Sequence, residues 1–168
     1  MCTVLGRFNV NQYATEIGCN ISRLDTKHMG EAIRTQIDVE VRYFETDQMG
    51  LVHHANYLVW FELARTDLCA RSGYHYADIE RIGYRLLNIE LQVRYRKPAR
   101  YGETASVTCW IEDLASRAIR FAYEVRRDDE LLVTGSTQHL WVEATSNHPC
   151  RTPKELRQPF RKLAGLEG

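Results

Sequence analysis

Residues 56–71 decide the fold, and they run Asn56-Tyr57-Leu58-Val59-Trp60-Phe61-Glu62-Leu63-Ala64-Arg65-Thr66-Asp67-Leu68-Cys69-Ala70-Arg71. The stretch opens with a residue suited to N-capping and closes two positions before Gly73, so it predicts one long helix of about 24 Å. Apolar side chains occupy nearly its whole circumference. We therefore expect other structure to enclose this helix rather than solvent.

Five further segments alternate apolar and polar residues, which is typical of strands with one buried face. They cover Gln36–Tyr43, Leu87–Tyr95, Ala105–Ile111, Ile119–Val125 and Leu131–Glu143. Half-solvated faces favour an antiparallel sheet, and we expect the last four strands to form a meander. The pattern predicts an α+β hotdog fold, a five-stranded antiparallel sheet curled around one long central helix.

The length and composition of the chain indicate a single globular domain. With 168 residues, 44% hydrophobic and 26% charged, the chain matches neither a disordered protein nor a coiled coil. Residues 1–34 show no clean period, and we expect them to form a leader without chemistry and a candidate for disorder. Residues 35–168 are predicted to form the hotdog domain.

Charge and cysteine content restrict the partners and the compartment. Lysine plus arginine number 22 and aspartate plus glutamate number 22. The chain therefore lacks the net positive charge that attracts nucleic acid, and we expect no nucleic-acid partner. Five cysteines without a C-x-x-C pair favour reduced thiols in the cytoplasm. No signal peptide and no run of about 18 apolar residues is present, so we expect no integral membrane segment.

The segment that carries chemistry lies between the first strand and the helix, from Tyr43 to Tyr57. A helix N-terminus supplies unpaired N–H groups that stabilise an anion developing on a bound carbonyl oxygen. Asp47 precedes this terminus by fewer than ten residues, and an acidic side chain there can activate water or attack the carbonyl itself. A serine or cysteine hydrolase is disfavoured, because there is no G-x-S-x-G motif and Cys69 lies among apolar neighbours.

A family resemblance rests on this segment and on the helix that follows. The matching residues are Tyr43-x-x-x-Asp47-x-x-Gly50-x-Val52-x-His54-x-Asn56-Tyr57, then Trp60-x-Glu62-x-Ala64-Arg65, and further on Tyr95-x-x-Pro98 and Gly102-Glu103. Over roughly residues 36–160 the chain resembles the 4-hydroxybenzoyl-CoA thioesterase-type hotdog acyl-CoA thioesterases.

That resemblance implies a catalytic role for Asp47, with a backbone N–H near His54 polarising the thioester carbonyl. Tyr43 and the His54 side chain are implied as assisting catalytic groups. It also implies an active site at a subunit interface, in a homodimer or homotetramer. We expect no cofactor. Asn56, Tyr57 and Trp60 are expected to bind substrate, with Trp60 shaping the acyl tunnel.

Two groups of charged residues have both a functional and a structural interpretation. Arg96, Lys97 and Arg100 lie where they could hold the phosphates of coenzyme A, although such a basic run is ordinarily a solvated face. Glu62 and Arg65 are three residues apart, and we expect them to pair with each other. No metal site is expected, because the adjacent pair His53 and His54 has no second cluster at ligand spacing.

The functional hypothesis is hydrolysis of acyl-CoA or acyl carrier protein thioesters to free acid and thiol, with Asp47 as general base or as nucleophile. The residues do not decide between those two routes. An alternative is a hotdog enoyl-thioester hydratase or dehydratase, which the absence of a His-Pro-Gly pattern disfavours. A non-catalytic acyl-thioester-binding protein is a further alternative, and residues 1–34 are short for the effector module that it would need.

Overall fold

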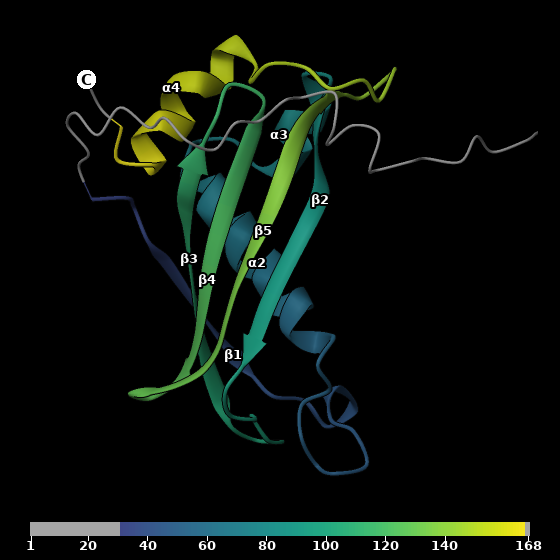
Figure 1. Ribbon diagram of the computed structural model, residues 1–168, viewed down its shortest axis with the longest axis vertical. Coiled ribbons are helices and arrows are strands. Elements are labelled where there is room, and N and C mark those ends of the chain that lie inside the picture. The colour runs from purple at the N-terminus through teal and green to yellow at the C-terminus, as the bar shows by residue number, and fades with distance from the viewer. Residues whose placement is uncertain (1–30, 167–168) are drawn as a thin grey trace, which may run out of the picture.

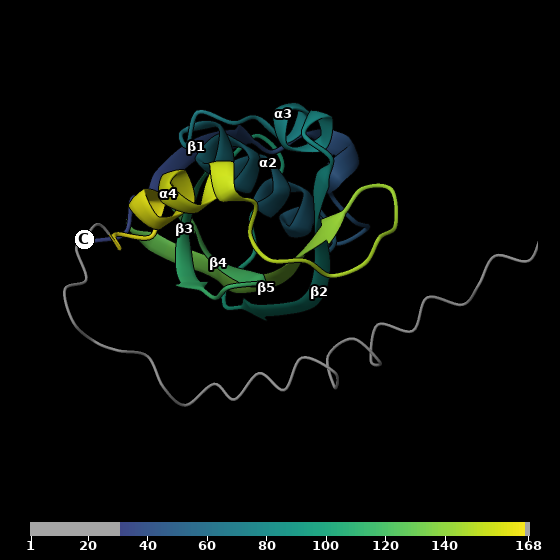
Figure 2. The ribbon, with the colours of Figure 1, turned by 90° about the horizontal axis from the view of Figure 1, so that it is seen from above.

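The computed structural model describes residues 31–166, so most of the predicted leader, residues 1–30, lies outside the described residues. One five-stranded sheet contains β1 (Thr35–Glu40), β2 (Tyr84–Tyr95), β3 (Thr104–Leu114), β4 (Ala118–Arg127) and β5 (Glu130–Glu143). All neighbouring strands are antiparallel. Helix α2 (Asn56–Ala70) lies across the concave face of the curled sheet (Figures 1 and 2). The predicted α+β hotdog architecture is confirmed.

The strand order β1-β3-β4-β5-β2 corrects the predicted four-strand meander. Only β3, β4 and β5 form a meander, and β2 pairs with β5 rather than with β3. The connection from β2 to β3 is held beside β1, because the Val41 N–H donates to Glu103 O at 2.9 Å and the Gly102 N–H donates to Val41 O at 3.1 Å. These bonds deliver β3 next to β1 and leave β2 as the opposite edge.

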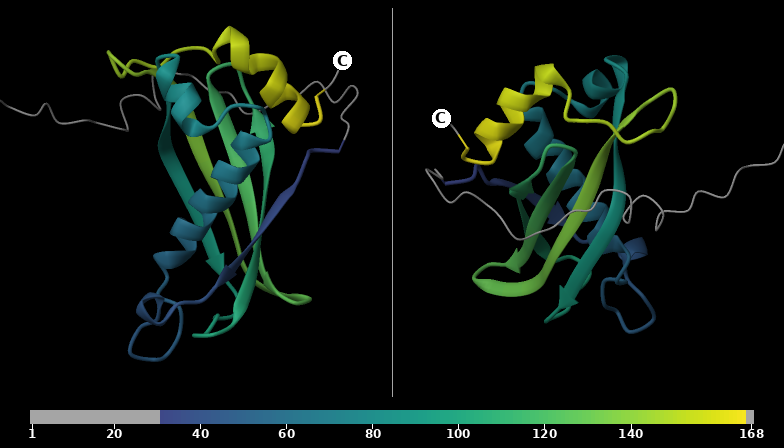
Figure 3. Two further views of the ribbon diagram at one scale, coloured as in Figure 1. Left: turned by 180° about the vertical axis from the view of Figure 1, so that it is seen from behind. Right: turned by 45° about the horizontal axis from the view of Figure 1, so that its top comes forward.

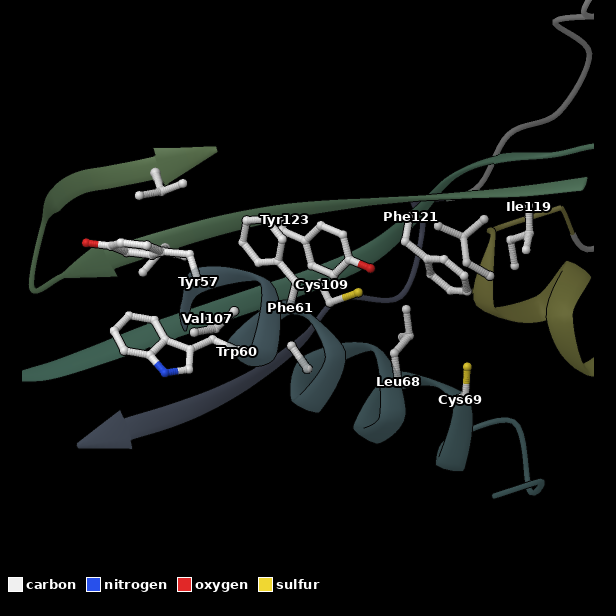
Figure 4. Close-up of a cluster of buried hydrophobic side chains, with 14 of the residues drawn as sticks. Tyr57, Trp60, Phe61, Leu68, Cys69, Val107, Cys109, Ile119, Phe121 and Tyr123 are labelled. Carbon is white, nitrogen blue, oxygen red and sulfur yellow. The ribbon is translucent and has the colours of Figure 1, made fainter. Parts of the chain in front are cut away.

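The core forms where one face of α2 meets the sheet. Trp60, Phe61 and Leu68 are at most 1% exposed and recur at helical spacing. Figure 4 shows them directed toward the side chains of β3 and β4. The Phe61 ring stacks on Tyr123 with centroids 4.3 Å apart. Burying each such large apolar side chain stabilises the fold by about 1.5–3 kcal/mol.

The opposite face of α2 is open, which corrects the expectation that the helix is enclosed on all sides. Val59 is 47% exposed and Leu63 is 48% exposed. They are four residues apart and therefore share one face. A single curled sheet covers one side of its helix, and the left view in Figure 3 shows the other side of α2 without a strand over it.

Two short helices were not predicted from the sequence, α3 (Tyr76–Arg81) and α4 (Lys154–Leu163). Helix α4 contains Pro159, which ordinarily interrupts a helical pattern because proline lacks an N–H. Its buried Leu156, Phe160 and Leu163 nevertheless lie on one face. Phe160 meets Trp141 edge-on at 5.5 Å, so packing on the sheet overrides the proline.

Candidate active site

Glu45 fastens the loop before α2 to the helix. Its carboxylate is 1% exposed and accepts hydrogen bonds from Arg42 Nη2 at 2.9 Å and Trp60 Nε1 at 3.2 Å. Its backbone carbonyl accepts from the His53 N–H at 2.8 Å and from Asn56 Nδ2 at 2.6 Å. Burial opposes ionisation of this carboxyl, but the hydrogen bonds from Arg42 and Trp60 outweigh it and lower the Glu45 pKa. The loop therefore meets the helix in one defined geometry.

Asp47 sits in the tight turn that follows. Its Oδ1 accepts from the Met49 N–H at 2.8 Å, and its own N–H donates to Leu51 O at 2.8 Å. Gly50 closes the turn at φ 70°, in the left-handed region that glycine adopts without strain. Within residues 31–166 no hydrogen bond reaches Asp47 Oδ2. The turn therefore fixes one carboxylate oxygen and leaves the other free.

A cavity of about 330 Å³ adjoins the N-terminal end of α2. It is lined by Asp47, Met49, Leu51, Val52, His54, Tyr57, Tyr95, Arg96, Lys97 and Pro98. The acid of the loop and the first residues before the helix thus share one hollow. Apolar side chains supply part of its wall, as a site that holds both a polar thioester and an acyl chain requires.

The helix terminus beside this cavity keeps free backbone donors. Ala55 is the N-cap residue and makes no side-chain cap, which corrects the sequence assignment of Asn56 as the cap. Asn56 instead donates its side-chain N–H to the loop. Among the hydrogen bonds found for residues 31–166, none has the His54 amide as its donor. A partial positive charge at this terminus is thus available to an oxyanion.

Two tyrosines that the sequence reasoning did not assign to catalysis brace the cavity. Tyr95 OH donates to His54 O at 3.0 Å, and Tyr57 OH accepts from the Ala99 N–H at 3.0 Å. Burial raises the pKa of Tyr57, so its phenol stays protonated at neutral pH. Tyr95 is part of the motif that carries the family resemblance. It lies on β2, 41 positions after His54, so the sequence alone did not indicate its hydrogen bond to the His54 carbonyl.

Several predicted site residues do not line this cavity. Tyr43 is 77% exposed and meets Tyr101 edge-on at 5.7 Å, outside the hollow. Trp60 is fully buried in the core, bonded to Glu45 rather than facing an acyl tunnel in the single chain. Asn56 and Arg100 also lie outside the lining. Of the three predicted phosphate ligands, Arg96 and Lys97 reach the hollow.

The predicted pair of Glu62 and Arg65 does not form. Glu62 is exposed, whereas Arg65 extends inward, with Nε donating to Tyr76 OH at 2.9 Å and Nη1 donating to Tyr123 OH at 3.3 Å. The cluster continues through Thr137, whose hydroxyl lies 2.8 Å from Tyr123 OH. The tyrosines offer neutral partners inside the fold, and the helix places Glu62 on its solvent side.

The buried thiol on α2 cannot serve as a nucleophile. Burial raises the pKa of Cys69 to about 12, so the thiolate is scarcely populated at neutral pH. This agrees with the sequence interpretation of Cys69 as a small apolar residue. The carboxylate of Asp47, in contrast, lines the cavity.

Comparison with known proteins decides the family. The family model of the thioesterase-like superfamily matches residues 41–160, which contain the loop, the helix and all the strands except β1. The chain belongs to the thioesterase-like superfamily. This thioesterase is 41% identical to the putative acyl-CoA thioesterase YneP of Bacillus subtilis, over 70% of this chain and 86% of YneP.

Solved structures agree with that assignment. A DHNA-CoA thioesterase from Staphylococcus aureus shares 32% sequence identity, with a TM-score of 0.73 over 77% of this chain and 90% of that one. Protein TT1821 from Thermus thermophilus shares 37%, with a TM-score of 0.74 over 78% of this chain and 98% of that one. The chain is therefore a thioester hydrolase of the hotdog type, as the motif around Asp47 predicted.

Proposed function

We propose that this thioesterase hydrolyses acyl-CoA thioesters to a free acid and a thiol, with Asp47 as the catalytic carboxylate. The observation that carries the proposal is the shared cavity, in which the Asp47 carboxylate and the N-terminal end of α2 face one hollow. The names of YneP and of the DHNA-CoA thioesterase support coenzyme A as the carrier. Acyl carrier protein remains the second carrier to test.

The thioester carbonyl oxygen accepts a hydrogen bond from the His54 amide, and the helix terminus stabilises the negative charge that develops there. In the general-base route Asp47 Oδ2 takes a proton from water, the water oxygen attacks the carbonyl carbon, and the C–S bond breaks. The leaving thiolate then takes up the proton that Asp47 removed. In the nucleophilic route Asp47 attacks the carbonyl carbon and the C–S bond breaks with loss of the thiolate. Water then hydrolyses the resulting mixed anhydride to the free acid and the Asp47 carboxylate.

The phosphates of coenzyme A are assigned to the basic residues at the rim. Arg96 carries the larger share, because its side chain makes no hydrogen bond or ion pair within residues 31–166 and it lines the cavity. Lys97 is already paired with Glu130, whose pKa is lowered by Lys97 and Arg127. Arg100 does not line the cavity, so we assign it only a minor role in binding the phosphates.

We place the site in a homodimer or homotetramer. Strand β2 is the last strand of the sheet, so its outer edge has no strand partner among the described residues. Leu91 and Tyr95 on β2 are 43% and 49% exposed, and the bare face of α2 adds Val59 and Leu63. The free edge of this long strand, together with these exposed apolar side chains, suits antiparallel pairing with a second copy, which would also close the cavity.

A cytoplasmic setting belongs to the same proposal. It is supported by Cys69, Cys109 and Cys150, which are free thiols in the structure. Within residues 31–166 there is no helix with the length and apolar character of a membrane span.

The function is tested by thiol release from short, long and aromatic acyl-CoA esters, with crotonyl-CoA hydration measured in parallel. We expect thiol release and no hydration. Hydration of crotonyl-CoA without thiol release would contradict the hydrolase assignment and indicate a hydratase. Single-turnover reaction in ¹⁸O-water then separates the two routes, since label entering Asp47 indicates the mixed anhydride.

A further inference from the structure

A second hollow lies at the end of the molecule opposite the Asp47 loop. Figure 1 shows α4 at the upper end and the loop before α2 at the lower end. Between α4 and the β3–β4 turn is a groove of about 370 Å³. It is lined by Leu114, Ala115, Ser116, Arg151, Thr152, Arg157 and Arg161. None of the residues proposed for thioester hydrolysis belongs to it.

The groove collects three arginine side chains that form no ion pair within residues 31–166. Arg157 Nε donates to Thr152 O at 2.9 Å and Arg161 Nη2 donates to Leu166 O at 3.0 Å, both of them neutral carbonyls. Within residues 31–166, Arg151 makes no side-chain hydrogen bond or ion pair, and no acidic residue lines the groove.

Some arginines elsewhere in the described residues pair with carboxylates. Examples are Arg42 with Glu45, Arg81 with Asp78 and Arg127 with Glu103. Arg151, Arg157 and Arg161 differ in that three guanidinium groups without an ion pair among the described residues lie around one hollow. Uncompensated charge that converges on a concave surface favours an anionic ligand over simple solvation.

The number of charges fits a ligand with two phosphates. A phosphate monoester carries about −1.5 to −2 charges at neutral pH, so two phosphates balance three guanidinium groups. The planar guanidinium fork matches phosphate oxygens in bidentate fashion. The backbone bonds of Arg157 and Arg161 hold two of the forks in place, and Leu114 and Ala115 offer an apolar wall beside them.

We propose that this groove binds a small ligand with two phosphate groups, such as a nucleoside bisphosphate. The ligand can be a free nucleotide or the nucleotide end of an acyl-CoA held by a neighbouring copy of the chain. The chemistry of recognition is the same in both cases.

Titration calorimetry of the full chain with adenosine 3′,5′-bisphosphate tests the binding. We expect saturable, salt-sensitive binding that Arg151→Gln/Arg157→Gln/Arg161→Gln weakens by about tenfold or more. Arg151→Gln/Arg161→Gln keeps the Arg157 bond to Thr152 and serves if the triple variant does not fold. The control Arg81→Gln/Arg85→Gln/Lys154→Gln makes the same change of charge outside the groove and should bind as the wild type does. Absence of binding to the wild type, or equal losses in groove and control variants, would overturn the proposal.

Kinetics with acyl-CoA and acyl-pantetheine identify the source of the ligand. If the groove holds the tail of acyl-CoA, Arg151→Gln/Arg161→Gln raises KM for acyl-CoA and leaves acyl-pantetheine unchanged. If it holds a free nucleotide, both KM values stay unchanged and calorimetry still registers the loss. The calorimetric result needs no turnover, so failure of the groove and failure of the thioesterase proposal are distinguishable.

Discussion

The loop before helix α2 and the interior of the fold beside this helix hold polar groups in opposite states. At the N-terminal end, Asp47 Oδ2 and the His54 amide have no hydrogen-bond partner among the described residues, and both belong to residues that line the 330 Å³ cavity. Further along, Arg65 donates to the hydroxyl of Tyr76 and to that of Tyr123 inside the fold. The difference indicates which groups hold structure and which remain free to react.

Burial deepens this contrast. In the interior cluster, removal from water raises the pKa of Tyr76 and Tyr123, so both phenols stay neutral beside the Arg65 guanidinium. Asp47, in contrast, lies in a half-buried turn where solvent still reaches. Substitutions at the N-terminal end should therefore affect turnover, and substitutions in the interior should affect stability.

The largest effect is expected from Asp47→Asn. The amide keeps the shape of the turn but can neither accept a proton from water nor attack the carbonyl, so turnover should fall by about 10²-fold or more. The free energy of unfolding should change little, because Oδ1 still accepts the Met49 N–H. Steady-state thiol release and urea unfolding check the two halves of this prediction.

Asp128→Asn is a matched control, since Asp128 is exposed and adopts a φ of 49° that asparagine tolerates. It should retain wild-type turnover. Near-normal turnover in purified Asp47→Asn would remove Asp47 from the chemistry, whatever the control does.

Gly135→Ala tests the interior half. A Cβ at this position on β5 would lie 2.5 Å from Phe61 Cε2 and 2.9 Å from the Gln92 carbonyl oxygen. Because Phe61 is stacked on Tyr123 and cannot move freely, overpacking should cost about 1–3 kcal/mol of unfolding free energy. Urea unfolding measures it, and Gly102→Ala, where no atom lies near the new Cβ but φ is 78°, separates packing from backbone strain. An unchanged midpoint for Gly135→Ala would show that the interior is loosely packed.

The sequence predicted the parts of this comparison that local patterns encode. Alternation located all five strands, and the Asp47 motif located the loop at the helix terminus, because both signals lie within a few adjacent residues. Pairing of β2 with β5 depends on a connection tied to β1, so no local pattern contains it. Arg65 was assigned to its neighbour Glu62, yet its partners lie 11 and 58 positions away.

His139 makes the stability of the interior depend on pH. Burial, together with the nearby Arg65 charge, lowers its pKa from 6.5 to about 3. The unfolded chain therefore binds a proton near pH 6.5 while the folded chain does not, so stability should fall as the pH decreases from 6.5 toward 3. Between pH 6.5 and pH 5 the loss should be about 1.5 kcal/mol relative to His139→Leu. Urea unfolding of the wild type and of His139→Leu at pH 6.5 and at pH 5 measures this loss. If the difference in unfolding free energy between the two proteins is the same at both pH values, the assignment is contradicted.

The smallest expected effect belongs to the rim of the N-terminal site. Arg96 is exposed and screened by solvent, so its attraction for a phosphate should contribute at most about 1 kcal/mol. Arg96→Gln should therefore raise KM for acyl-CoA by about threefold to fivefold at low salt, with kcat unchanged, because the phosphates lie far from the reacting carbonyl. Arg94→Gln, two residues earlier and outside the cavity, removes the same charge and should leave KM in place. Equal increases of KM in Arg96→Gln and Arg94→Gln would mean that the summed positive charge of the strand, and not Arg96 itself, attracts the substrate. A fall in kcat in Arg96→Gln would mean that Arg96 takes part in the chemical step.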